Sequence, residues 1–243
     1  MVIRLFMLIA SLAGIFGLVQ LSSDNRQLRV EIDQLEAELG RMSIDDADRV
    51  YLVEIDSPDV PPEVAAHLKF VWQFRCYLPP GYDFTLFSGS GRVAKEGLYQ
   101  NGGFGSNGGS PHPEAIHKLM TVSFQRKGDL WEAFHSFGGS SGTSSWLSIN
   151  QDRLSEALVV QKLVNSQQGP RSFEQGTILP LLKIFDSTSA KDDMVAGKTL
   201  TTYEGGFMVL CPKSRELEFN QLRQGETPLD FDPRWIATEV GDE

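Results

Sequence analysis

Hydrophobic residues follow three successive patterns along the chain, and the first is an unbroken run. Residues 2–21 contain one charged side chain, Arg4, and every residue from 5 to 19 is apolar, Gly, Ala or Ser. Backbone groups inside a bilayer must hydrogen-bond within their own segment, so a run of this kind crosses as a helix. At about 1.5 Å per residue, about 20 residues span the roughly 30 Å hydrocarbon core. Residues 1–21 are therefore predicted to form a single transmembrane anchor.

Two alternatives compete for this run, a cleaved signal peptide and a buried core helix. A signal peptide needs small residues at its cleavage site, and the best match, residues 11–13, lies in the middle of the run. The arginines on the two sides, Arg4 against Arg26 and Arg29, are nearly balanced and do not fix the orientation. We expect the C-terminal part on the extracytoplasmic side of a cell membrane, because its Gly-, Ser- and aromatic-rich sequence resembles that of exported β domains.

The second pattern is an apolar repeat of 3.5 residues within residues 22–43. Two alternating sets form one stripe: Asn25, Ile32 and Leu39 at heptad position a, and Leu28, Leu35 and Met42 at position d. Ile at a with Leu at d favours parallel dimers, and a lone Asn at a fixes their register. We predict a coiled-coil helix over residues 22–43 and a homodimer formed through residues 18–42. The alternative is a single amphipathic helix that packs on its own C-terminal domain.

The third pattern is alternation, which predicts an all-β domain, sandwich or barrel-like, over residues 44–215. Aromatic and aliphatic side chains take every second position in residues 69–78 and 118–126, as half-buried strands require. Weaker strand candidates are residues 50–55, 82–87, 130–137, 145–149, 181–185 and 207–211. Pro180 predicts that its strand begins there or lies on an edge.

Glycine, serine and proline clusters predict turns at residues 79–81, 88–91, 101–110 and 138–145. One short helix is predicted at residues 61–68, and residues 151–164 fit either a helix or a strand. Residues 216–243 hold eight acidic residues and two arginines. This composition predicts a solvated, partly flexible acidic tail.

Charge and cysteine content exclude several classes of protein. The 22 Lys and Arg residues against 32 Asp and Glu give a net charge of −10, which argues against nucleic acid as a partner. Two cysteines, Cys76 and Cys211, are too few for a disulfide framework or a cysteine-rich zinc site. Both lie in apolar strand candidates, so we predict buried free thiols, with a disulfide as the alternative in an exported domain.

Two groups of residues match the letters of catalytic or metal sites. Residues 138–142 spell G-x-S-x-G, but every histidine precedes Ser140, whereas the α/β-hydrolase order places the histidine after the serine. His112, Glu114 and His117 have side chains that bind divalent metals, yet His112 lies between two prolines. We interpret the first group as a hairpin loop and the second as surface polar residues. The sequence assigns no catalytic, cofactor-binding or metal-ligating residue, and no cofactor.

Two further motifs resemble phosphate-binding loops. Residues 103–108 spell G-x-G-x-x-G but are followed by a Gly- and Pro-rich stretch, not by the helix start that a dinucleotide needs. Residues 197–199 resemble the end of a P-loop, but Asp192 stands where its first glycine belongs. We interpret the first motif as a long loop and reject the second.

The order of anchor, coiled-coil helix and β domain resembles that of bitopic bacterial cell-envelope scaffold proteins, and this resemblance is one of architecture alone. The leading hypothesis is a single-pass, non-enzymatic cell-envelope protein whose β-rich domain binds an envelope protein or supports an assembly. The alternative is a tethered domain that binds a carbohydrate or another ligand through exposed aromatic rings. Its candidates are Trp72, Phe74, Tyr77, Tyr82, Phe84, Phe87, Trp131 and Trp146. A membrane-tethered hydrolase is the third hypothesis.

Overall fold

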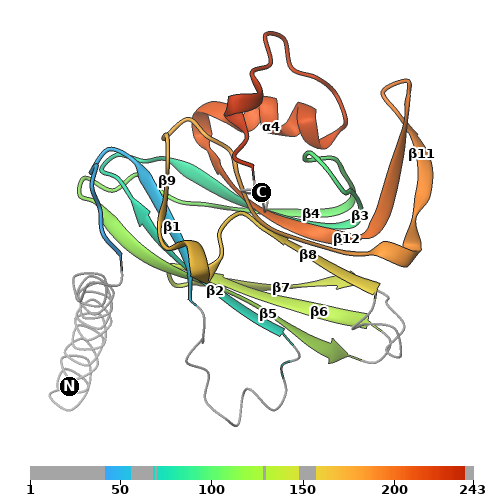
Figure 1. Ribbon diagram of the computed structural model, residues 1–243, viewed down its shortest axis with the longest axis horizontal. Coiled ribbons are helices and arrows are strands. Elements are labelled where there is room, and N and C mark those ends of the chain that lie inside the picture. The colour runs from blue at the N-terminus through green and yellow to red at the C-terminus, as the bar shows by residue number, and fades with distance from the viewer. Residues whose placement is uncertain (1–41, 56–67, 69, 128–129, 148–156, 239–243) are drawn as a thin grey trace, which may run out of the picture. The chain divides into compact units, whose positions relative to one another are not determined.

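The computed structural model describes residues 42–55, 68, 70–127, 130–147 and 157–238 (Figure 1). The predicted anchor lies outside these residues, as do nearly all of the predicted coiled coil and of the helix predicted at residues 61–68. Among the described residues, no helix has both the length and the apolar character that a membrane crossing requires. The compact unit that carries the sheets runs from Ile44 to Glu243.

Sheet A contains six antiparallel strands in the order β7-β6-β5-β2-β1-β9. Their bounds are β1 (Val50–Ile55), β2 (Phe70–Leu78), β5 (Ile116–Lys127), β6 (Leu130–Phe137), β7 (Ser140–Leu147) and β9 (Arg171–Phe173). The alternation predicted for β2 and β5 is confirmed, because alternate side chains of both strands, Phe74, Cys76 and Leu78 and then Met120, Val122 and Phe124, are buried in one core. The two strands expected at residues 50–55 and 130–137 have the expected bounds.

Sheet B follows the order β4-β3-β12-β10-β8, and β11 also pairs with β12. Its strands are β3 (Phe84–Ala94), β4 (Gln100–Gly108), β8 (Leu158–Lys162), β10 (Leu179–Asp186), β11 (Lys191–Val195) and β12 (Lys198–Pro212). Residues 158–162 thus form a strand, within the stretch 151–164 whose sequence fitted either a helix or a strand. The strand β10 begins at Leu179, one residue before Pro180, and its pairing with β8 begins only at Leu182. The proline therefore lies at the start of the strand, within one residue of the predicted boundary.

The two sheets pack face to face around a core that both supply, which confirms the all-β prediction. At the β1 and β8 side of the core, Glu54 and Lys162 replace apolar residues on the inner faces. The Lys162 ammonium lies 2.7 Å from both carboxylate oxygens of Glu54, so an ion pair joins sheet A to sheet B. Cys76 and Cys211 are buried and not bonded to each other, as the sequence predicted.

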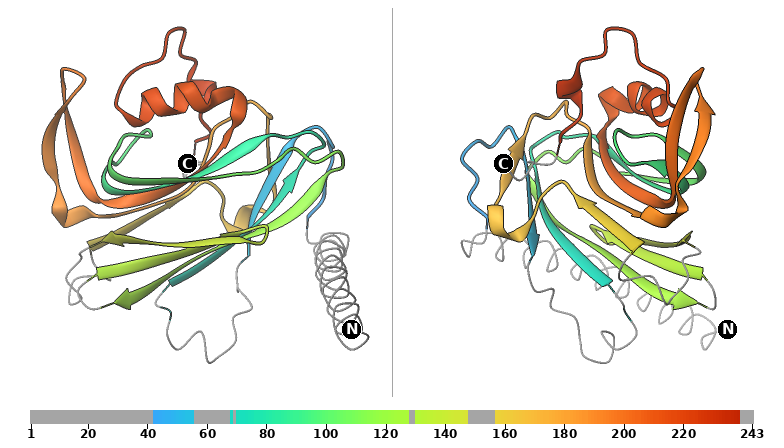
Figure 2. Two further views of the ribbon diagram at one scale, coloured as in Figure 1. Left: turned by 180° about the vertical axis from the view of Figure 1, so that it is seen from behind. Right: turned by 45° about the vertical axis from the view of Figure 1, so that its right-hand side comes forward.

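Sheet B turns sharply along a row of glycines that we call the crease. In the pairing register Gly102 of β4 lies opposite Gly91 of β3, and Gly91 lies opposite Gly205 of β12. Gly91 and Gly102 have φ angles of +123° and +148°, which residues with side chains rarely adopt. A Cβ on Gly205 would collide with the carbonyl oxygen of Ile184. Glycine rows of this kind let a sheet bend, and both the β3–β4 and β11–β12 hairpins turn away from β5, β6 and β7 (Figure 2).

The outer face of sheet B is covered by helix α4 (Glu216–Arg223), which follows the 3₁₀ turn η5 (Lys213–Arg215). Phe219 of α4 is fully buried and stacks on Phe87 with ring centroids 4.6 Å apart. Further along, Ile178 donates its N–H to the Trp235 carbonyl, and Ala237 donates to the Ile178 carbonyl. Residues 216–238 are therefore not the solvated end that their acid count predicted, because a few apolar side chains are enough to hold them on the sheet.

Two predicted turns are wrong. Residues 88–91 lie inside β3, and residues 101–108 form most of β4. Their glycines mark the crease and the exposed strand beside it, not a reversal of the chain. The cluster at 138–145 is partly right: Gly138 and Gly139 form the β6–β7 turn with φ of +55° and +88°, but β7 begins at Ser140.

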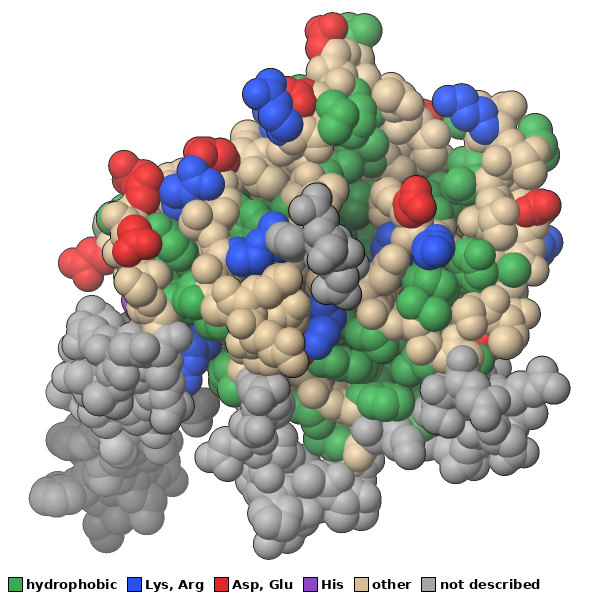
Figure 3. All heavy atoms as spheres, in the orientation of Figure 1, with side chains coloured by type: hydrophobic (Ala, Val, Ile, Leu, Met, Phe, Trp, Pro, Cys, Tyr) green, Lys and Arg blue, Asp and Glu red, His purple; other side chains and the backbone are tan. Residues whose placement is uncertain are grey.

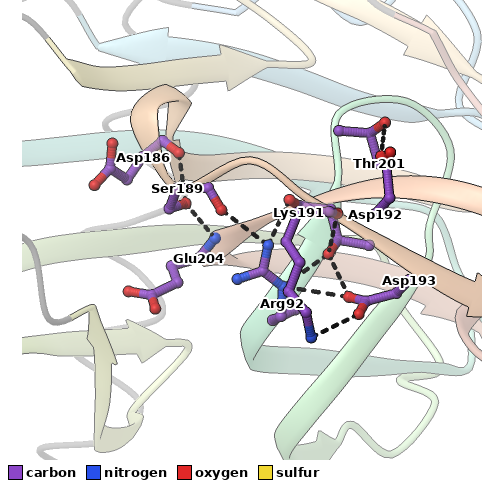
Figure 4. A network of polar contacts seen from close by, with 9 residues as sticks. Arg92, Asp186, Ser189, Lys191, Asp192, Asp193, Thr201 and Glu204 are labelled. Atoms are coloured by element: carbon purple, nitrogen blue, oxygen red, sulfur yellow. Dashed lines mark hydrogen bonds and ion pairs between the residues drawn. The ribbon is translucent and has the colours of Figure 1, made fainter.

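A polar network fixes the base of the β11–β12 hairpin (Figure 4). Arg92 donates to the hydroxyl and the carbonyl of the buried Thr202 at 2.7 and 2.6 Å, and to the Ser189 carbonyl at 2.9 Å. Its guanidinium also lies 3.4 Å from a carboxylate oxygen of Asp193. Hydrogen bonds from Lys191 and Thr202 lower the pKa of Asp193 below its ordinary value. The hairpin therefore leaves the sheet in one fixed direction.

Substituting Ala for Gly205 should lower the free energy of unfolding by about 1–3 kcal/mol, because the new methyl group meets the backbone of β10. Gly105→Ala is the matched control, since no atom lies within 4 Å of a Cβ at that position and the cost should stay within about 0.5 kcal/mol. Chemical denaturation of the full-length chain measures both changes. Equal stabilities of the two variants would contradict a crease that requires glycine.

Candidate functional site

A cleft of about 320 Å³ opens between the sheets where β3 and β4 face β6 and β7. Its walls come from both sheets: Leu86, Ser88, Ser90 and Gly103–Asn107 from sheet B, and His135 and Thr143 from sheet A. Leu86 still belongs to the apolar core, and Ser88 and Ser90 follow it on the same face of β3. The cleft exists because small residues replace core side chains at the point where the crease turns sheet B away.

The lining combines polar with apolar surface and carries no carboxylate, ammonium or guanidinium group. It offers hydroxyls from Ser88, Ser90 and Thr143, the amide of Asn107 and the imidazole of His135. Backbone groups of the glycines in β4 add further donors and acceptors. A surface of this kind recognises uncharged polar groups through hydrogen bonds, and its volume lies at the small end of the range for ligand sites.

His135 is the ionisable side chain of the cleft. A Cβ at Gly142 would lie 3.0 Å from His135 Cε1 and 3.1 Å from Nε2, so the ring lies over a position that only glycine leaves open. His135 Nδ1 is buried and has no hydrogen-bond partner among the described residues. Burial lowers the pKa of His135 below its ordinary value. The imidazole is therefore neutral at neutral pH, where it can donate through one nitrogen and accept through the other.

The β4 wall is held in place from behind by α4. Phe104 is 38% exposed and stacks on Phe87, with ring centroids 5.2 Å apart. The guanidinium of Arg223 lies 4.1 Å from the centroid of the Phe104 ring. Arg223 also donates to Gln100, whose amide donates to the Ser90 and Gly103 carbonyls. The wall is thus rigidly supported although its own side chains are small.

The structure does not bring the metal-binding candidates together. His112 and Glu114 are exposed before β5, whereas His117 lies in β5 with its ring centroid 5.2 Å from that of Tyr77. The described residues contain no group of three or more His, Cys, Asp or Glu side chains arranged to hold a metal ion. Ser140 is exposed at the start of β7 and is not among the residues that line the cleft.

The Gly-rich motifs take structural positions. Residues 103–108 lie in an edge strand, which differs from the loop that the sequence predicted, and they form one wall of the cleft. Gly197, with a φ of +77°, forms the β11–β12 turn together with Ala196, whose φ is +47°. Paired positive φ angles are typical of two-residue hairpin turns.

Most of the proposed stacking rings are unavailable to a ligand. Six of the eight candidates are buried: Phe74, Tyr77, Tyr82, Phe84, Phe87 and Trp131. Trp72 is half-buried against Phe124, with ring centroids 5.8 Å apart, and the side chain of Trp146 lies outside the described residues. The alternating aromatic residues of this chain are therefore mainly core residues and not ligand-binding rings.

His135 is the cleft residue that the sequence analysis passed over, although a signal for it was present. Trp131, Ala133 and Phe137 occupy alternate positions of β6 and enter the core. His135 falls on the same face by the same count. A titratable side chain on an apolar face indicates either an internal polar contact or an opening, and here it marks the opening.

Comparisons with protein-family models, with curated proteins and with solved structures find no match for the chain. The described residues form an antiparallel β-sandwich with a cleft between its two sheets.

Acidification should destabilise the protein through His135. Because burial lowers the folded pKa of His135 below the ordinary value of 6.5, the unfolded chain takes up the proton first as pH falls through that value. We therefore expect stability to decrease between pH 7.5 and pH 5, and His135→Gln to make that decrease smaller, with thermal unfolding as the measurement. His112→Gln, in an exposed loop, is the matched control; an equal effect of both substitutions would contradict the burial of the His135 imidazole.

Proposed function

We propose that the chain is a non-enzymatic, single-pass membrane protein of the cell envelope whose β domain binds a partner in the cleft. The observation that carries this proposal is the lining of the cleft, which is rich in hydroxyl, amide and imidazole groups and has no ionised side chain. Such a lining supports recognition of uncharged polar groups. The partner is an envelope protein or a polysaccharide, and nucleic acid is disfavoured by the net charge of −10.

Hydrolysis is less well supported than binding. A serine or cysteine hydrolase needs a nucleophile beside a base, and a third group that orients the base. The lining holds one imidazole, but its Nδ1 has no hydrogen-bond partner in the described part of the chain. The two thiols are buried, and burial raises the pKa of Cys76 to about 12, which keeps it protonated.

A polysaccharide is the second candidate partner, and the hydroxyl groups of the cleft favour it. The Phe104 ring is not part of this argument, because it stacks on Phe87 and lies against Arg223 on the other face of β4. The hydroxyls of Ser88 and Ser90 are suited to the donors and acceptors of a sugar. A protein partner would use the same groups, so experiment must separate the two.

The membrane part of the proposal rests on residues 1–21, with the lipid bilayer as partner and residues 22–43 as the stalk. We expect the full-length chain to stay with the membrane fraction after carbonate and high-salt washes, because about 20 apolar residues insert with a large gain in free energy. N-terminal sequencing of the retained chain is the control. A mature chain that begins after the apolar run would contradict the anchor.

A photoreactive amino acid at Ser88 tests the cleft in intact cells. We expect a distinct adduct of higher mass from Ser88 and none from the same probe at Thr199, which is exposed on β12 and is not a cleft residue. Loss of the added mass after periodate treatment would identify a polysaccharide, and peptides of a second protein in the mass spectrum of the adduct would identify a protein. If Ser88 gives no adduct, or no more than Thr199, the cleft is not the binding site.

A further inference from the structure

β4 is an edge strand whose outer backbone groups have no partner strand among the described residues. Gly109 donates to the Phe84 carbonyl at one end of the β3–β4 pair, and Ala94 donates to the Tyr99 carbonyl at the other. In an antiparallel ladder the hydrogen-bonded pairs alternate with pairs that face outward. The N–H and C=O groups of Gly102, Phe104, Ser106 and Gly108 therefore point to the open side of the sheet. Gln100 has the same direction in the ladder, but it is 2% exposed and so is not open to a second chain.

This edge lacks the features that normally keep strand edges from pairing. Proteins protect edges with charged side chains, proline, bulges or very short strands. The nine residues of β4 include no charged residue and no proline, and residues 101–106 are all exposed. Each of the other edges has one of these features: β9 has three residues and begins with Arg171, β8 ends with Lys162, and β11 contains Lys191, Asp192 and Asp193. The edge strand β7 is uncharged like β4, but its pairing with β6 shifts register at Trp131 and Glu132, as at a bulge.

We propose that the open edge of β4 pairs with β4 of a second copy of this chain, antiparallel and across a twofold axis at Gly105. Charge decides in favour of a second copy. Two chains that each carry a net charge of −10 repel one another, so they can approach most easily along an uncharged strip. On the face shown in Figure 3, Asp and Glu lie interspersed with Lys and Arg. A twofold interface also needs a surface that complements itself, and an uncharged strand edge complements itself.

The position of the axis follows from the hydrogen-bonding pattern. All four outward-facing residues find partners only if Phe104 pairs with Ser106 of the second copy and Gly102 pairs with Gly108. That register places Gly105 opposite its own equivalent in a pair without hydrogen bonds, where the Cα atoms are about 4.5 Å apart. Side chains are closest at such a pair, and glycine removes them. Gly103 then lies opposite Asn107 of the second copy.

Cysteine crosslinking of the full-length chain in cells tests this register. Gly105→Cys should form a disulfide-linked dimer under mild oxidation, because a side chain at this position meets no atom within 4 Å in its own chain. Gly103→Cys should not, since its equivalent lies about 14 Å away, beyond the roughly 7 Å that a disulfide spans. Differently tagged copies carrying Gly103→Cys and Asn107→Cys should link to one another. The native thiols stay silent, because burial raises the pKa of both.

A proline substitution separates edge pairing from association through the predicted helix. Ser106→Pro removes an N–H that points outward and leaves the bonds between β3 and β4 in place. The Gly105→Cys dimer should therefore be lost with Ser106→Pro and kept with Ser106→Ala, while the thermal midpoint stays the same. A dimer that survives Ser106→Pro would overturn the proposal, as would equal linking of Gly103→Cys and Gly105→Cys. If Ser106→Pro fails to fold, the mixed pair of Gly103→Cys and Asn107→Cys decides, and absence of that linked dimer would overturn the proposal. Absence of a linked Gly105→Cys dimer would overturn it too, for example because another protein occupies the edge.

Discussion

Sheet B can bend because three adjacent strands bring a glycine to the same line. At Gly205 the backbone of β10 approaches so closely that a methyl group has no room, and at Gly91 and Gly102 the φ angles exclude ordinary side chains. The bend gives sheet B two different surfaces. Its outer face curves around α4 and buries Phe219, whereas its inner face leaves sheet A and opens the cleft.

The inner faces of the two sheets are joined at one side of the sandwich and separated by the cleft at the other. Between β1 and β8 the sheets remain close, and the Glu54–Lys162 ion pair joins them where the apolar alternation ends. Between β3 and β6 the alternation ends in serine and histidine, and the space is left unfilled. Polar inner-face residues thus close one side and line the other. The difference depends on whether the sheets are near enough for two side chains to meet.

The sequence predicted the fold well and the site poorly, for one physical reason. Alternating apolar residues report burial directly, so β2 and β5 could be located from their pattern. Glycine reports only that a side chain is absent, and turns, bends and close contacts all need that. Residues 88–91 therefore suggested a turn although they lie within β3, because the partner glycine that explains them is in β12. Helix α4 was missed for a similar reason, since burial of Phe219 depends on a distant sheet.

The crease also limits where the chain can change in length. One residue added to β3 between Phe84 and Gly91 would move that glycine out of line with Gly102 and Gly205. Every side chain beyond it would also move to the opposite face of the sheet. The exposed stretch at residues 110–114 carries no such requirement, because it lies after the strand and outside the pairing register. Insertions and deletions compatible with this fold therefore belong in such connections, and the spacing along the creased strands is fixed.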